Sequence, residues 1–278
     1  MNSPSRFPLA AAVAVWAIVC SFVGAGAAPL AFPSSEYGLC LGNSPVFNGL
    51  RIDLRDRDVR QIRGVNLTLW APGDNEKSRI SGLSIGLVAP GGGTLIGISL
   101  GGVGVAANNI YGLAAGGLGV GVAGKASGIL IGGLGIGIDE DLRGIGIGGL
   151  GVGAGGNVSG IAVGGLAIGA GKAVRGLALA GGAIGAGDRI AGLAAAGGWL
   201  RTSRLRGLGL TAGYLSCEDL TGLGLASIVR VRGTQRGVTV ALLNLARHLH
   251  GVQLGLLNCA RNNPPALRWL PVLNLHLR

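Results

Sequence analysis

A glycine followed by an aliphatic residue recurs about every 15 residues through most of this 278-residue chain. Successive members of the series are 14 to 18 residues apart, and each one precedes Leu, Ile or Val. A fixed short period marks a protein of stacked repeats, in which each unit contacts only its neighbours. The series is Gly49, Gly64, Gly82, Gly97, Gly112, Gly128, Gly144, Gly160, Gly176, Gly192, Gly207, Gly222, Gly237 and Gly251.

The pattern inside one unit predicts short strands joined by corners. In the unit that begins at Gly160, Ile161 and Val163 alternate with small residues, which indicates a strand with one buried face. Leu166 and Ile168 are in phase with each other but not with the first pair, and a straight strand cannot bury both pairs on one face. We therefore expect a bend between the pairs, with all four side chains pointing inward.

The same assignment places the intervening Ala162 on the outside. Ile161→Asp is then expected to be costly and Ala162→Asp mild.

A further aliphatic residue stands just before the next glycine, for example Val158 before Gly160 and Val174 before Gly176. Each unit then has three short sides, and coiling the chain gives an all-β, three-sided β-solenoid of about 14 rungs with a period of 15–16 residues. Rungs spaced like neighbouring strands would form a rod of roughly 65 Å. The alternative is an up-and-down outer-membrane β-barrel with one strand per unit, but the change of phase within a unit breaks the continuous lipid-facing side that such strands need.

The first 27 residues have the features of a signal peptide. Arg6 precedes an apolar run from Leu9 to Val23, and Ala25-Gly26-Ala27 is a small-residue cleavage pattern, so the mature chain is expected to start near Ala28. An uncleaved membrane anchor is the alternative. Either way, the segment predicts export to the periplasm, the outer membrane or the cell surface.

The sequence leaves the pairing of the cysteines open. The exported chain would keep Cys40, Cys217 and Cys259, and an odd number implies no disulfide framework. Cys259 falls at an expected inward position, where we predict a small buried apolar side chain.

Positive charge gathers in the C-terminal third. The net charge is +11, and residues 200–278 hold ten arginines but only two acids, Glu218 and Asp219. An anionic envelope component is a possible partner for this region, although corner arginines also serve solubility. Export and an aromatic content of 4% argue against nucleic-acid binding.

The repeat domain spans residues 49–261, between an expected irregular N-terminal cap at 28–48 and a C-terminal cap at 262–278. The many charges of residues 51–60 suggest an end rung whose outer edge repels added strands. Asn244 and Asn258 occupy equivalent positions in the last two units, which predicts a side-chain ladder.

These last two units resemble a family of bacterial surface-repeat proteins with tandem G-V-x-I-G-L-x-N-x-A units. The matching segments are Gly237–Ala246 and Gly251–Ala260, and the likeness weakens in the central units, which have Gly-Gly and no Asn. The resemblance implies location in the cell envelope and no known activity.

No catalytic, cofactor-binding or metal-binding residue is predicted. His248 and His250 would share a strand face but lack a third zinc ligand, and Asp139-Glu140-Asp141 is interpreted as a solvated turn. The Gly-Lys turns at Lys125 and Lys172 lack the Ser or Thr of a phosphate-binding loop. We expect a non-enzymatic structural or interaction element of the bacterial cell envelope; the alternative is a membrane-inserted barrel or membrane-associated protein.

Overall fold

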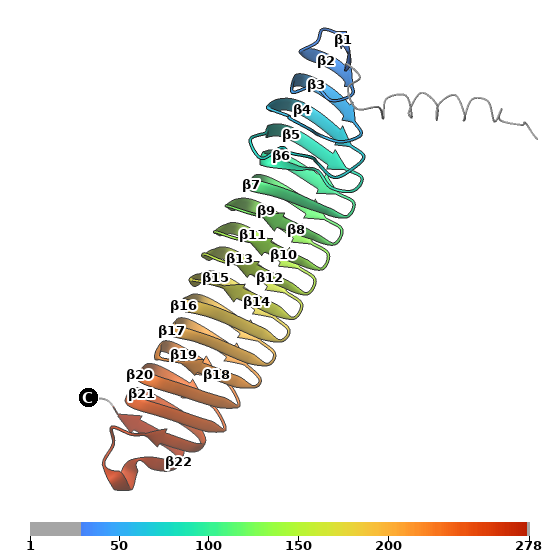
Figure 1. Ribbon diagram of the computed structural model, residues 1–278. Helices are drawn as coiled ribbons and strands as arrows, with labels where there is room; N and C mark the ends of the chain where they lie inside the picture. The colour runs from blue at the N-terminus through green and yellow to red at the C-terminus, as the bar shows by residue number, and fades with distance from the viewer. Residues whose placement is uncertain (1–28, 277–278) are drawn as a thin grey trace, which may run out of the picture.

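The computed structural model describes residues 29–276, which coil into a rod of stacked rungs (Figure 1). Equivalent segments of successive rungs pair in parallel, and Gly128, Gly144 and Gly160 are direct register partners. The chain is therefore the β-solenoid that its repeat predicts, rather than an antiparallel meander. The predicted signal peptide, residues 1–27, and its cleavage site lie outside the described residues.

Strands follow one another along the rod from the N-terminal to the C-terminal end. The first rungs contain β1 (Leu30–Pro33), β2 (Tyr37–Leu41), β3 (Val46–Asp53), β4 (Gln61–Thr68), β5 (Arg79–Gly86), β6 (Gly91–Gly101) and β7 (Gly104–Gly116). The central rungs contain β8 (Gly119–Val122), β9 (Ala126–Gly132), β10 (Gly135–Ile138), β11 (Leu142–Gly148), β12 (Gly151–Ala154), β13 (Val158–Gly164), β14 (Ala167–Ala170), β15 (Ala173–Ala180) and β16 (Ala183–Ala196). The last rungs contain β17 (Trp199–Thr211), β18 (Tyr214–Cys217), β19 (Asp219–Leu225), β20 (Ile228–Val240), β21 (Leu243–Ala260), the 3-10 turn Pro265–Leu267 and β22 (Trp269–His276).

Each rung has three sides, which we number from the corner glycine. In the rung that starts at Gly128, side 1 is Ile129–Gly132, side 2 is β10, and side 3 is Leu142–Arg143, which leads into the next corner glycine. All glycines of the sequence series have positive φ, and Gly38 extends the series by one rung at the N-terminal end.

Gly144 illustrates why the corner residue is glycine. Its φ is 120°, a conformation that side chains rarely adopt, and an added Cβ would collide with the carbonyl oxygen of Gly128 in the preceding rung. The period of the sequence therefore follows from the close stacking of one corner on the next.

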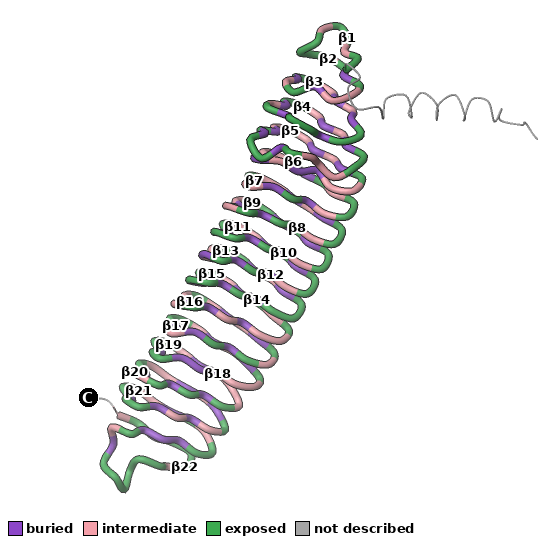
Figure 2. Tube along the Cα trace, viewed as in Figure 1, coloured by how far each residue is buried: buried purple, intermediate pink, exposed green. Residues whose placement is uncertain are grey.

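The core is built mainly from sides 2 and 3. A row of aliphatic side chains stands two residues before most of the corner glycines, and a second row lies on side 2. The first row includes Ile62, Ile80, Leu95, Ile110, Leu142, Val158, Val174, Ile190, Leu205, Leu220 and Leu249, and the second includes Val105, Val120, Ile136, Val152, Ile168, Ile184, Leu200, Leu215 and Val229. Figure 2 shows buried and exposed positions alternating along the strands around this core.

The predicted phase of side 1 is wrong by one residue. Ile161 is 39% exposed, Val163 is half-buried and Leu166 is 60% exposed, whereas Ala162 is fully buried; only Ile168 points inward as expected. The rows on sides 2 and 3 fill most of the narrow interior, so the inward positions of side 1 are small in most central rungs. The fully buried Leu130 is an exception, and there the side-3 row holds the small Ala126, two residues before Gly128. At Gly146, for example, an added Cβ would lie 2.8 Å from Cδ2 of Leu142.

Both ends of the rod are capped by strands. The segment expected to be irregular contains β1 and β2: β2 pairs in parallel with β3, and β1 pairs antiparallel with β2. At the other end, β22 folds back antiparallel on β21, within the segment 262–278 that was expected to be a cap. The loop 71–77 leaves the rod between β4 and β5, and Asn75 anchors it by accepting a hydrogen bond from the Val59 amide at 2.9 Å.

Candidate functional site: an apolar face along the rod

Two rows of apolar side chains project outward from side 1, at the first and third positions after each corner glycine. We call this surface the apolar face. The first row is Phe32, Leu39, Leu50, Val65, Leu83, Ile98, Leu113, Ile129, Ile145, Ile161, Leu177, Leu193, Leu208, Leu223, Val238, Val252 and Leu275. The second row is Leu30, Leu41, Ile52, Leu67, Ile85, Leu100, Ala115, Ile131, Ile147, Val163, Leu179, Ala195, Leu210, Leu225, Val240, Leu254 and Leu273. Every residue in both rows is half-buried or exposed.

The two rows are continuous from one cap to the other. Each member is the register partner of the next along the rod, as for Ile129, Ile145 and Ile161. The antiparallel cap strands keep the pattern, because Phe32 pairs with Leu39 at one end and Leu275 pairs with Val252 at the other. A cap needed only to end the stack would not have to repeat an exposed apolar pattern.

The apolar face is larger than the usual exposed patch of a soluble protein. Strand spacing and residue rise give a length of about 75 Å and a width of about 10 Å. Typical monomers expose contiguous apolar patches of about 300–600 Å², and larger ones mark interaction sites. This size makes the face the leading candidate for a functional surface.

A row of exposed corner residues widens the face along one edge. Leu118, Leu134, Leu150 and Leu166 are 51–60% exposed, and each donates its backbone N–H to the equivalent residue of the preceding rung. Towards the C-terminal end, an open groove of about 1240 Å³ runs along the edge from Val163 to Leu256.

Charge is absent from this side of the rod after the rung that starts at Gly49. From Gly64 to the last rung, none of the six residues that follow a corner glycine is charged. Between Gly97 and Gly192, all charged residues lie within the five positions before a corner glycine: Lys125, Asp139, Glu140, Asp141, Arg143, Lys172, Arg175, Asp188 and Arg189. These rungs are therefore amphipathic, with their charged groups on and near side 3.

An arginine-containing row borders the apolar face across the glycine corner. The residue immediately before the corner glycine is exposed arginine at Arg63, Arg143, Arg175, Arg206 and Arg236. Register partners make this a single row, which also holds Tyr37, Tyr111 and His250 but no acid. In the described part of the chain, no ion pair within 4 Å joins any of these arginines to a carboxylate.

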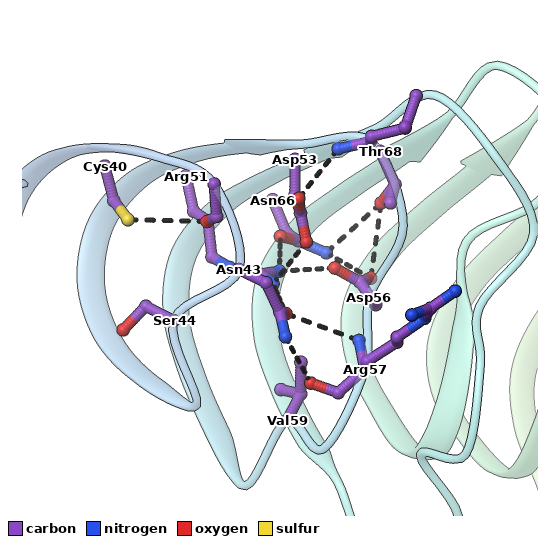
Figure 3. Close-up of polar contacts among 12 residues, drawn as sticks. Cys40, Asn43, Ser44, Arg51, Asp53, Asp56, Arg57, Val59, Asn66 and Thr68 are labelled. Atoms are coloured by element: carbon purple, nitrogen blue, oxygen red, sulfur yellow. Dashed lines mark hydrogen bonds and ion pairs between the residues drawn. The ribbon is translucent and has the colours of Figure 1, made fainter. Parts of the chain in front are cut away.

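A buried polar cluster fills the interior of the first rungs (Figure 3). Arg51 is fully buried and contacts Asp53 at 2.9 Å, Asp56, Asn66 at 2.7 Å and Asn43. Burial raises the pKa of the Asp53 carboxyl against the opposing effect of the Arg51 guanidinium. The charges of this unit therefore do not all line an outer edge, as the sequence suggested; three of them hold the end of the core together.

The acidic run, the two lysine turns and the histidines singled out in the sequence lie in structural contacts or exposed turns. Asp141 caps the turn of the next rung: its carboxylate accepts hydrogen bonds from the backbone and side-chain amides of Asn157, at 2.7 and 2.9 Å, which lower its pKa. Lys125 lies 3.8 Å from Glu140 across the same corner, and Lys172 is exposed in a turn. His276 lies beside His250 with ring centroids 5.8 Å apart. Over residues 29–276, no three potential metal ligands gather around one point.

Cys40, Cys217 and Cys259, the cysteines of the described residues, are free and buried. Burial raises the pKa of the Cys217 thiol to about 12. Cys259 is buried as predicted. Its place in the repeat, however, continues a row that points outward at Arg230 and Leu245, and its register partner is Trp269 of the cap. The predicted ladder is confirmed, because Asn244 donates a 2.8 Å hydrogen bond to Asn258 inside the core.

Sequence reasoning missed the apolar face because it assigned these aliphatic residues to the core. A usable signal was the size limit at the second position after the corner glycine, which is Gly146, Ala162, Ala178, Ala194, Gly209 and Gly224 in six rungs. A position that admits only small residues is confined, whereas the neighbouring positions accept Ala, Val, Ile and Leu.

Comparisons of the chain with protein families, characterised proteins and solved structures gave no match. Among the described residues, no helix has the length and hydrophobicity to cross a membrane.

Proposed function

We propose that this protein is a non-enzymatic, exported interaction element of the bacterial cell envelope, and that its working surface is the apolar face. The observation that carries the proposal is the continuity of that face through every rung and both caps. An apolar surface of this length is stabilised when another apolar surface covers it.

The sequence features support the same proposal. The predicted signal peptide directs the chain out of the cytoplasm, and the likeness of Gly237–Ala260 to bacterial surface repeats points to the envelope. The groove beside the apolar face is open and lined largely by aliphatic, Gly and Ala residues, a lining suited to contact rather than to acid–base chemistry.

Fractionation of cells that produce the tagged chain tests the proposal. We expect the protein in the envelope fraction, with an N-terminus near Ala28 by mass spectrometry. Recovery in the cytosol with Met1 intact would contradict it. The matched variant Ala25→Leu/Ala27→Leu, which removes the small residues of the cleavage pattern, should leave residues 1–27 attached without changing the fraction.

A further inference from the structure

We propose that the apolar face lies on the surface of an anionic phospholipid membrane, with the arginine row at the level of the lipid phosphates. This inference rests on the proposed envelope function and names the partner of its working surface. An apolar face with a cationic border is the arrangement by which amphipathic elements lie in the membrane interface without spanning it.

The outer surface of side 1 suits the boundary between headgroups and acyl chains. It carries two aliphatic rows and, for six residues after each corner glycine from Gly64 onward, no charge that would have to be desolvated. The adjoining side 2 adds no obstacle in the central rungs, because Gly121, Gly137, Gly169 and Gly185 face open space. One flank of the rod can therefore enter the interface while side 3 remains in water.

The arginine row provides the electrostatic part of the contact. Arg143, Arg175, Arg206 and Arg236 stand one residue before the corner glycine, two residues from the first aliphatic row, and all are exposed. Guanidinium groups bind phosphates in a bidentate manner, and each basic residue near an anionic surface strengthens binding. Tyr37 and Tyr111, in the same row, are 57% and 44% exposed, and tyrosine is enriched at membrane interfaces.

A second copy of the chain fits the face less well. In one two-fold packing of two apolar faces, the arginine rows would lie side by side and repel. In the other, each row would meet the uncharged corner row of Leu118 and Leu134, so its charges would have no partner. An anionic membrane supplies phosphates along the full length of the row.

Vesicle flotation tests the proposal with the protein purified as the cell makes it, its N-terminus established by mass spectrometry. Vesicles contain phosphatidylcholine alone or an equal mixture with phosphatidylglycerol, and binding is measured at low and high salt. We expect binding to the anionic vesicles and a decrease with salt, because exposed charges are screened.

The apolar contribution is tested with the double variant Ile129→Glu/Ile161→Glu. Its matched control is Lys172→Glu, which changes the net charge by the same amount at an exposed turn away from the face. The double variant should bind anionic vesicles at least about tenfold more weakly, and the control less than about threefold, because only the former adds charge at the interface. Equal losses in the two would overturn the proposal.

The arginine row is tested with Arg175→Gln/Arg206→Gln/Arg236→Gln. The control is Arg232→Gln/Arg247→Gln/Arg261→Gln, which removes three exposed charges from the corner between sides 2 and 3, away from the apolar face. We expect a loss on the order of tenfold to a hundredfold for the first and under about threefold for the second. This pair also carries the test if the glutamate variant fails to give the wild-type circular dichroism spectrum.

Two results would overturn the proposal of membrane binding and leave the proposed location in the cell envelope unaffected. One is an absence of binding to either type of vesicle. The other is a stable dimer in light scattering that Ile129→Glu/Ile161→Glu converts to monomer, which would make a second copy the occupant of the face. Recovery of the protein in the cytosol would instead overturn the proposed function itself.

Discussion

The two faces of side 1 differ in a way that reverses the usual relation between hydrophobicity and burial. On β13, Ala162 points inward and is fully buried, while its neighbour Ile161 points outward and is 39% exposed. The larger aliphatic side chains lie outside because sides 2 and 3 have already filled the interior. The comparison shows that in a narrow solenoid the size of a side chain can decide its direction more strongly than its polarity.

The inner row of side 1 also changes along the rod. Its second-position residues are Arg51 and Asn66 near the N-terminal end, small residues in the centre except for Leu130, and Thr239 and Gln253 near the C-terminal end. At the C-terminal end, Gln235 donates to Thr239 at 2.9 Å and Gln253 donates to Gln235 at 3.0 Å, so both buried side-chain N–H groups have partners. The outer rows stay apolar throughout, so the two faces follow separate constraints.

Deleting half a rung should have the largest effect on folding of all the changes considered, because it disrupts the separation of inner and outer rows. Removal of Gly160–Ala167 would place side 2 of one rung against side 1 of the next, and we expect loss of cooperative folding. Removal of the whole unit Gly160–Arg175 keeps the register and should leave a shorter folded rod, since repeat stability is roughly a sum of rung and interface contributions. Thermal unfolding followed by circular dichroism compares the two; equal damage would contradict the nearest-neighbour stacking of rungs.

A charge on the inner face should be far more destabilising than the same charge on the outer face. Ala162→Asp would bury an unpaired carboxylate and should cost about 3–5 kcal/mol or more. Ile161→Asp, at a position that is 39% exposed, should cost about 1 kcal/mol or less. Denaturant unfolding of the two variants measures the difference, and an equal or reversed order would show that the assignment of the two faces is wrong.

The two kinds of glycine should respond differently to an added methyl group. Gly144→Ala forces a side chain into positive φ and against the Gly128 carbonyl, with an expected cost of about 2–4 kcal/mol. Gly137→Ala, on the outer surface of side 2, meets no atom within 4 Å and should be neutral within about 0.5 kcal/mol. Chemical denaturation provides the measurement, and a costly Gly137→Ala would show that the outer surface of side 2 is covered in solution.

The smallest expected effect is a change in how the unfolding free energy depends on pH, and it concerns the buried thiol of Cys217. Because burial raises the pKa of this thiol to about 12, its contribution to stability is complete below the unfolded pKa near 9 and is lost as the pH rises towards 12. Cys217→Ala should therefore reduce the alkaline loss of stability by about 1 kcal/mol at pH 10. The check is the difference in unfolding free energy between pH 8 and pH 10 for both proteins. An identical pH dependence in the two would mean that water reaches this inner row.

Several features were determined by the sequence alone. The glycine period predicted the solenoid, the change of phase after Val163 predicted a corner, and the equivalence of Asn244 and Asn258 predicted a side-chain ladder, although not its burial. These are local or nearest-neighbour properties: a positive-φ corner needs glycine, and residues one period apart must stack. They can be inferred without knowing the cross-section of the rod.

Which face of side 1 points into the core was decided only by the tertiary structure. Alternation with a period of two identifies two faces of a strand but does not say which is inner when one face is Ile and Val and the other is Gly and Ala. That choice depends on how much room Leu142 and Val152 leave across the rung, because these side chains approach the position of Gly146 from two other sides. The packing of three sides into one narrow interior therefore turned a predicted core into the exposed apolar face.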